Sequence, residues 1–177
     1  MLYVQQSLGP DEELVHIGQF HWMYTVGAFF SIIWSLLLGV VIIIGAIKLY
    51  IIFGNEPMKN AGVMESILIL HPVIRLGAFL VFIFGLLKFA HMMVVKATTE
   101  IAITNNRLIF KRGLVARQVG EINIDRIEGV NVLQTIMGRV FNYGRIMVRG
   151  MGVGEVVLPP IEDPIAFRKA IEKAKAL

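Results

Sequence analysis

The hydrophobic and polar positions divide the chain into an apolar front half and a back half in which apolar and polar residues alternate. Residues 22–47 form a long apolar run that contains no charged residue. As a helix this run would be about 39 Å long, whereas a bilayer needs only ~20 apolar residues for one span. Every face of the helix would be apolar, which a small soluble domain cannot accommodate. The pattern predicts a membrane span over about 22–50.

A second apolar stretch follows a polar connector at 54–65 and predicts a second span over about 67–90. Pro72 and Lys88 interrupt the stretch. Proline is tolerated in membrane helices, and a long cationic side chain near a helix end can reach the aqueous interface. Residues 22–95 are therefore interpreted as a transmembrane hairpin.

Arg75 is the most unusual residue of this hairpin, and two interpretations of it stay open. Inside the bilayer its charge would be costly and would need a polar partner, such as Ser31 or Ser35 on the first span. If the helix instead begins at Pro72, Arg75 lies at the outer interface and needs no partner. The second interpretation requires fewer assumptions.

The distribution of cations predicts the orientation of the hairpin. Thirteen of the 17 Lys and Arg residues lie at or after Lys96. The positive-inside rule then places residues 96–177 in the cytoplasm, and two spans place the N-terminal tail, residues 1–21, on the same side. The expected location is the cell membrane, as a multipass protein with both termini cytoplasmic. Trp22, Lys88 and Lys96 are expected at the membrane interface.

The back half changes to the two-residue period of strands. Six or seven short strands are predicted, with turns at Asn105-Asn106 and in the glycine-rich segment 150–154, and with a helical turn within 135–142. Asp163 and Pro164 have the residue types of an N-cap and a first helical position, so a C-terminal helix follows them. The predicted fold class is α+β: a two-helix transmembrane hairpin followed by a small antiparallel β-barrel that the C-terminal helix caps.

Composition excludes several kinds of chemistry from residues 96–177. They contain no Ser, Cys, His or Trp, which removes Ser-His triads, thiol nucleophiles and histidine metal sites. The carboxylates Glu121, Asp125 and Glu128 surround Arg126 and are interpreted as a salt-bridged corner. The loop 150–154 precedes a strand, whereas a phosphate-binding glycine loop opens a helix. No catalytic residue, metal site, cofactor or small-molecule substrate is predicted, and the protein is not expected to be an enzyme.

The same segment carries a net charge of +5, which favours an anionic membrane surface. Lys111, Arg112 and Arg117 are the candidate lipid- or anion-binding residues. The alternative is a solvated surface without a specific ligand. Nucleic acid is not an expected partner, because no aromatic side chains alternate with these charges.

Several short motifs of the back half occur in a fixed order. They are TNNRLI at 104–109, the pattern I-x-x-x-R-I-x-x-V-x-V-x-Q from Ile122 to Gln134, Gly138-Arg139, Tyr143-Gly144 and DPIAF at 163–167. This order resembles the bacterial pleckstrin-homology-like domain of YdbS-like proteins, also called membrane-flanked domain proteins. The resemblance implies a pleckstrin-homology-like barrel at 96–177, on the cytoplasmic side of a membrane hairpin and often beside a related partner. It implies no enzymatic reaction.

The leading hypothesis is therefore a non-catalytic membrane protein. Its cytoplasmic domain would self-assemble or bind a protein partner, including a related membrane-flanked protein, in envelope stress or membrane homeostasis. The alternative is a sensor of anionic lipid or another anion through the basic patch. Apart from these candidates, the lipid bilayer is the one partner expected.

Overall fold

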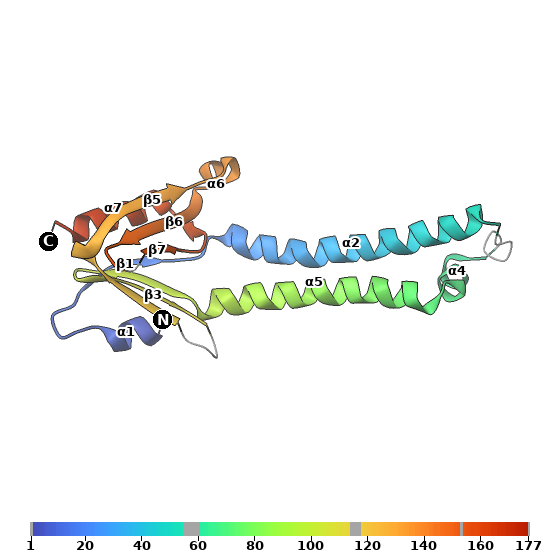
Figure 1. Ribbon diagram of the computed structural model, residues 1–177, viewed down its shortest axis with the longest axis horizontal. Helices are drawn as coiled ribbons and strands as arrows, with labels where there is room; N and C mark the ends of the chain where they lie inside the picture. Colours follow the sequence, from blue (N-terminus) through green and yellow to red (C-terminus); the bar gives the residue numbers. More distant parts are fainter. Residues whose placement is uncertain (1, 55–60, 114–117, 153, 177) are drawn as a thin grey trace. The chain divides into compact units, whose positions relative to one another are not determined.

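The computed structural model describes residues 2–54, 61–113, 118–152 and 154–176 (Figure 1). The chain divides into two compact units. The sheet unit consists of Met1–Tyr24 and Val94–Leu177, and the helix unit consists of Thr25–Met93. The N-terminal residues therefore belong to the same unit as the C-terminal half, and they are not the separate tail that residues 1–21 were expected to form.

The first sheet of the sheet unit shows why the N-terminal segment belongs there. Its antiparallel strands follow the order β1-β2-β3-β4. They span β1 (Leu14–Gly18), β2 (Glu100–Thr104), β3 (Arg107–Arg112) and β4 (Gln118–Asn123). β1 pairs with β2 from Leu14 opposite Thr104 to Gly18 opposite Ile101. The short helix α1 (Leu2–Ser7) precedes β1, and its Val4 packs with Ala102 and Ile109.

A 3₁₀ turn, η1 (Ile124–Arg126), connects the first sheet to the second. The second sheet has the order β5-β6-β7, and β8 also pairs with β6. Its strands are β5 (Ile127–Leu133), β6 (Tyr143–Gly150), β7 (Gly154–Val157) and β8 (Ile161–Glu162), and α6 (Ile136–Val140) connects β5 to β6. Since η1 ends the pairing of the first sheet before β5 begins the second, the described strands form two separate sheets. The predicted closed barrel is not observed.

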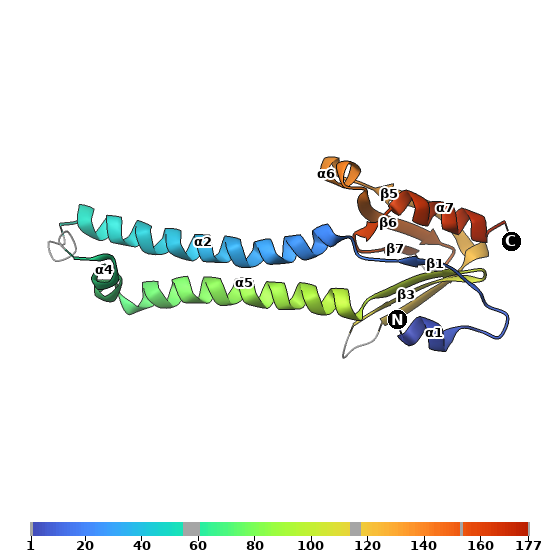
Figure 2. The same cartoon turned by 180° about the vertical axis from the view of Figure 1, so that it is seen from behind.

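The C-terminal helix α7 (Pro164–Ala174) packs on β1, β2, β5 and β6 (Figure 2). The Asp163 carboxylate accepts a hydrogen bond from the Ala166 N–H at 3.0 Å, and Pro164 occupies the first helical position. Both features confirm the predicted helix start. Phe167 and Ile171 of α7 are buried in one core with residues of both sheets. This core contains Ile101, Ile103, Leu108, Ile122, Ile146, Val148 and Leu158.

The two long helices are α2 (Trp22–Ile52) and α5 (Pro72–Thr98), and the short helix α4 (Val63–Ile69) precedes α5. Both long helices are candidate membrane spans, and only 11% of the most apolar window of each is buried. α2 begins at the predicted residue. α5 begins at Pro72 instead of 67 and continues to Thr98. β2 begins at Glu100, two residues after α5 ends.

Within the helix unit, small residues bring the two long helices together. A Cβ atom added at Gly85 would lie 1.9 Å from the Ser35 Oγ atom and 2.3 Å from the Ser35 Cβ atom. The Ser31 hydroxyl donates a hydrogen bond to the Gly85 carbonyl at 3.3 Å. Close packing through small residues is a usual basis of helix association in membranes.

We expect the substitution Gly85→Leu to force α2 and α5 apart and to destabilise the hairpin by about 1–3 kcal/mol, the usual cost of overpacking. Thermal unfolding of the detergent-solubilised protein, followed by circular dichroism, measures the change. Gly77→Leu is the matched control, because a Cβ atom at Gly77 meets nothing within 4 Å. Equal unfolding temperatures for the two variants would contradict the packing described here.

Candidate functional site

Lys111, the first residue of the predicted basic patch, forms an ion pair within the sheet unit. Its Nζ atom lies 3.0 Å from the Glu100 Oε1 atom, and the two side chains are only 14% and 11% exposed. The same carboxylate accepts hydrogen bonds from the N–H groups of Tyr3 and Val4, each at 3.2 Å. Burial alone would raise the pKa of Glu100, but Lys111 and the Val4 N–H hold it below its ordinary value. Lys111 and Glu100 therefore fasten α1 to the sheet.

The other two residues of the patch are less constrained. The exposed Arg112 donates a hydrogen bond from Nε to the Gln118 Oε1 atom at 2.9 Å. It also lines a cavity of about 260 Å³ that Arg145 shares. Arg117 lies outside the described residues. An anion site made of these three residues stays a prediction.

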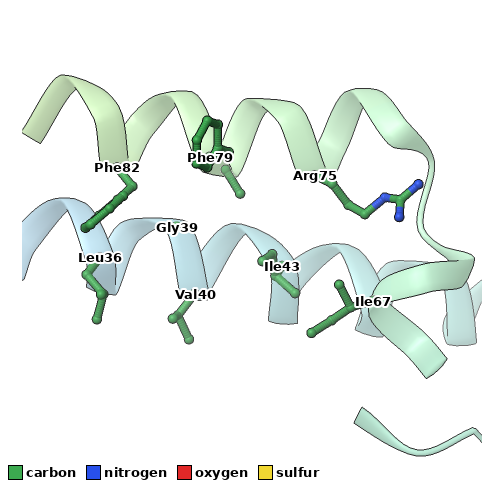
Figure 3. Close-up of a pocket in the computed structure, with 9 residues that line it drawn as sticks. Leu36, Gly39, Val40, Ile43, Ile67, Arg75, Phe79 and Phe82 are labelled. Atoms are coloured by element: carbon green, nitrogen blue, oxygen red, sulfur yellow. The ribbon is translucent and has the colours of Figure 1, made fainter. Parts of the chain in front are cut away.

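The helix unit contains a cavity of about 380 Å³ with Arg75 at one end (Figure 3). Its other walls are apolar side chains, among them Val40, Ile43 and Phe79. The Nε atom of Arg75 is buried and has no hydrogen-bond partner within the part of the chain that the structure describes. Arg75 lies in the first turn of α5, as the interface interpretation requires. The depth of Arg75 in a bilayer stays a prediction.

The two serines considered as partners of Arg75 bond to backbone carbonyls instead. The Ser31 hydroxyl donates to the Ala28 carbonyl at 2.7 Å, and the Ser35 hydroxyl donates to the Ile32 carbonyl at 2.8 Å. Neither serine is therefore the partner of the guanidinium.

Three residues were expected at the membrane interface, and the structure gives a side-chain contact for Trp22. It is the first residue of α2, and its indole contacts the Phe141 ring edge-on, with the ring centroids 5.8 Å apart. Lys88 and Lys96 both lie on α5. The depth of these residues in a bilayer stays a prediction.

A larger cavity, of about 940 Å³, lies in the sheet unit between α6, the adjoining ends of β5 and β6, and the start of α7. Three arginines line it: Arg139 from α6, Arg145 from β6 and Arg168 from α7. The other lining residues are Val132, Leu133, Gln134, Thr135, Tyr143, Gly144, Pro160 and Ile165. We call this space the α6 cavity.

The motif residues of the sequence shape the wall of this cavity. The Gln134 side-chain amide donates to the carbonyls of Gly138 and Tyr143, at 3.3 and 3.1 Å. The Thr135 hydroxyl accepts a hydrogen bond from the Gly138 N–H at 3.1 Å and so caps α6. Glycine is required at 138, because a Cβ atom there would lie 2.6 Å from the Tyr143 carbonyl oxygen. The Gly138-Arg139 and Tyr143-Gly144 motifs thus build the turn that carries Arg139.

Only one of the three arginines of the α6 cavity has an ion-pair partner among the described residues. Arg168 donates to Glu172 at 2.9 Å on the exposed face of α7. Arg139 and Arg145 have no ion pair or hydrogen bond with any residue in the described ranges. The described lining contains no carboxylate and no imidazole, so its chemistry suits binding of an anion better than proton transfer. Sequence reasoning missed this cluster because its arginines come from three separate elements, and only the Gly138-Arg139 motif pointed to it.

A comparison with protein families matches residues 14–175 to the bacterial PH domain. The matched range begins at β1 and includes both long helices, in agreement with a sheet unit that starts before the helices. No curated protein and no solved structure matches the chain. The narrower resemblance to YdbS-like proteins stays a prediction. Because the match covers most of the chain, the protein belongs to the bacterial PH domain family.

Proposed function

We propose that this protein is a non-catalytic multipass membrane protein that presents its PH-like sheet unit on the cytoplasmic side of the cell membrane, for self-assembly or for binding a protein partner. The observation that carries the proposal is the insertion of the helix unit between two paired strands. β1 ends at Gly18 and α2 begins at Trp22, while α5 ends at Thr98 and β2 begins at Glu100. Two short connections thus tether the sheet unit to the membrane helices.

The free edges of the two sheets supply a contact surface. β5 is an edge strand of seven residues, and it exposes Glu128, Asn131 and Leu133. An unpaired edge strand can accept a strand from another chain, with main-chain hydrogen bonds giving affinity. The proposed partner is a second copy of this chain or a related membrane-flanked protein, and the proposed process is envelope stress or membrane homeostasis.

Cysteine cross-linking in native membranes tests the assembly, because the chain has no cysteine of its own. We expect Asn131→Cys to give a covalent dimer, or one adduct with a partner, after treatment with a thiol cross-linker. Lys169→Cys, on the exposed face of α7, is the control and should stay monomeric. A monomer at position 131 and also at Asn123→Cys, on β4 at one edge of the first sheet, would overturn the proposal. The same Lys169→Cys protein should react with a membrane-impermeant thiol reagent only in opened cells.

The second candidate function is recognition of anionic lipid or another anion through Lys111, Arg112 and Arg117. The observation that favours it is the cavity that Arg112 shares with Arg145. Against it stands the ion pair of Lys111 with Glu100, which already neutralises one of the three cations.

A further inference from the structure

The helix α6 presents three apolar side chains to solvent. Ile136 is 83% exposed and Val140 is 69% exposed, and Met137 between them is also exposed. These side chains of the five-residue helix point outward and are not part of the core of the sheet unit. Exposed apolar groups on a tight turn are typical of a surface that another apolar phase covers.

The contacts of the same segment indicate which phase that is. Phe141, which follows α6, contacts Trp22, the first residue of a candidate membrane span. His21 stacks on Tyr143 with ring centroids 5.1 Å apart. The apolar segment is therefore continuous with the point at which the chain enters α2. A tryptophan at this position is typical of the membrane–water interface.

The cations of the α6 cavity lie next to this apolar segment. Arg139 is in α6 itself, and Arg145 lines the same cavity from β6. Apolar side chains beside unpaired guanidinium groups form the pattern of segments that lie in the interface of an anionic bilayer. A guanidinium binds a phosphate through two parallel hydrogen bonds. The cavity, at about 940 Å³, also has room for a polar headgroup.

We propose that the segment 135–141 inserts its apolar side chains into the bilayer, and that the α6 cavity binds the phosphate of an anionic phospholipid through Arg139 and Arg145. The inference rests on the membrane anchoring proposed above, but it concerns a different surface from the β5 edge. A free phosphate ion would match the arginines alone, whereas a lipid matches the arginines and the apolar segment together.

Insertion is tested on the full chain in lipid nanodiscs. We expect a polarity-sensitive fluorophore on Met137→Cys to be quenched by spin-labelled acyl chains, and the same fluorophore on Lys169→Cys to be unaffected. A protein that enters nanodiscs but leaves the label at 137 unquenched would overturn this inference alone. A protein that does not enter nanodiscs would overturn the membrane anchoring and this inference with it.

Lipid selectivity is tested by mass spectrometry of the lipids bound in nanodiscs of phosphatidylcholine mixed with phosphatidylglycerol. We expect Arg139→Gln/Arg145→Gln to reduce the enrichment of phosphatidylglycerol by roughly 30-fold, because two cations at about 1 kcal/mol each near an anionic surface amount to about 2 kcal/mol. Lys169→Gln/Lys173→Gln removes the same charge from α7 and should leave the enrichment unchanged. An equal loss in both double variants would overturn the site, and so would a loss found only in Lys111→Gln/Arg112→Gln. Displacement of the lipid by inorganic phosphate alone would also overturn it.

Discussion

A fragment of residues 96–177 is expected to stay unfolded, although it contains every described strand except β1. A chain in which a short glycine- and asparagine-containing turn replaces Thr25–Met93 is expected to fold as a soluble protein. The turn-replaced chain keeps the N-terminal segment with β1, whereas the fragment lacks it. β1 and β2 are antiparallel neighbours, so a short turn can join them without the helices.

The loss of stability in the fragment follows from the contacts of β1 with β2 and α7. Ile101 and Ile103 of β2 are fully buried, and the loss of β1 would leave the edge of their strand unpaired. His16 of β1 packs edge-on against Phe167 with ring centroids 5.6 Å apart. Gly18 lies so close to Phe167 that a Cβ atom there would be 2.9 Å from the ring. Since a small domain has a total stability of only about 5–15 kcal/mol, the loss of a central contact surface of α7 is expected to abolish folding.

Circular dichroism and amide-proton dispersion in NMR spectra distinguish the outcomes. The turn-replaced chain should show a cooperative thermal transition, and the 96–177 fragment should show none. A fragment that folds cooperatively without β1 would contradict the role assigned to the N-terminal segment.

The substitution Glu12→Gln is expected to destabilise the sheet unit by about 2–3 kcal/mol at neutral pH. The Glu12 side chain is only 4% exposed, and its carboxylate accepts hydrogen bonds from Arg107 Nε and Nη2, at 2.9 and 2.7 Å, and from the Thr104 hydroxyl at 2.6 Å. Removing one member of a buried pair costs about 3–5 kcal/mol. We place the effect lower because the Arg107 side chain is 25% exposed and keeps its ion pair with Glu121.

The pH dependence of this effect has a definite sign. Burial alone would raise the pKa of Glu12, but its hydrogen bonds with Arg107 and Thr104 hold the pKa below its ordinary value of 4.5. A carboxyl group with a lowered pKa in the folded state contributes stability above pH 4.5, and loses it as the pH falls through the folded-state pKa. The difference between wild type and Glu12→Gln should therefore be constant above that pH and should shrink below it.

Chemical denaturation of the turn-replaced chain across this pH range measures both quantities. Glu155→Gln is the control, because its ion pair with Arg149 is exposed and is expected to contribute less than about 1 kcal/mol. If the destabilisation by Glu12→Gln were independent of pH down to the acid transition, the ion pair would not be its cause.

The sequence was sufficient to predict the helices and turns that form through interactions between neighbouring residues. The uncharged run from Trp22 predicted α2, because an apolar helix of this length needs no particular partner. Asp163 and Pro164 predicted the start of α7, because a cap acts within one turn. The turn at 105–106 and the helical turn at α6 were predicted for the same reason. The order of motifs also indicated the family before any contact was known.

Tertiary structure alone decided which segments meet. The sequence LVHIG at 14–18 is too short to identify a strand, and its pairing with β2 closes a separation of more than 80 residues. The sequence does not show that Lys111 pairs with Glu100, because the two residues meet only when β2 pairs with β3. Arg139 and Arg145 likewise form a cluster only when α6 and β6 are in position. The separation into two sheets likewise depends on η1. Periodicity and capping are properties of neighbouring residues, whereas partners and charge balance come from contacts between distant ones, which only the folded chain specifies.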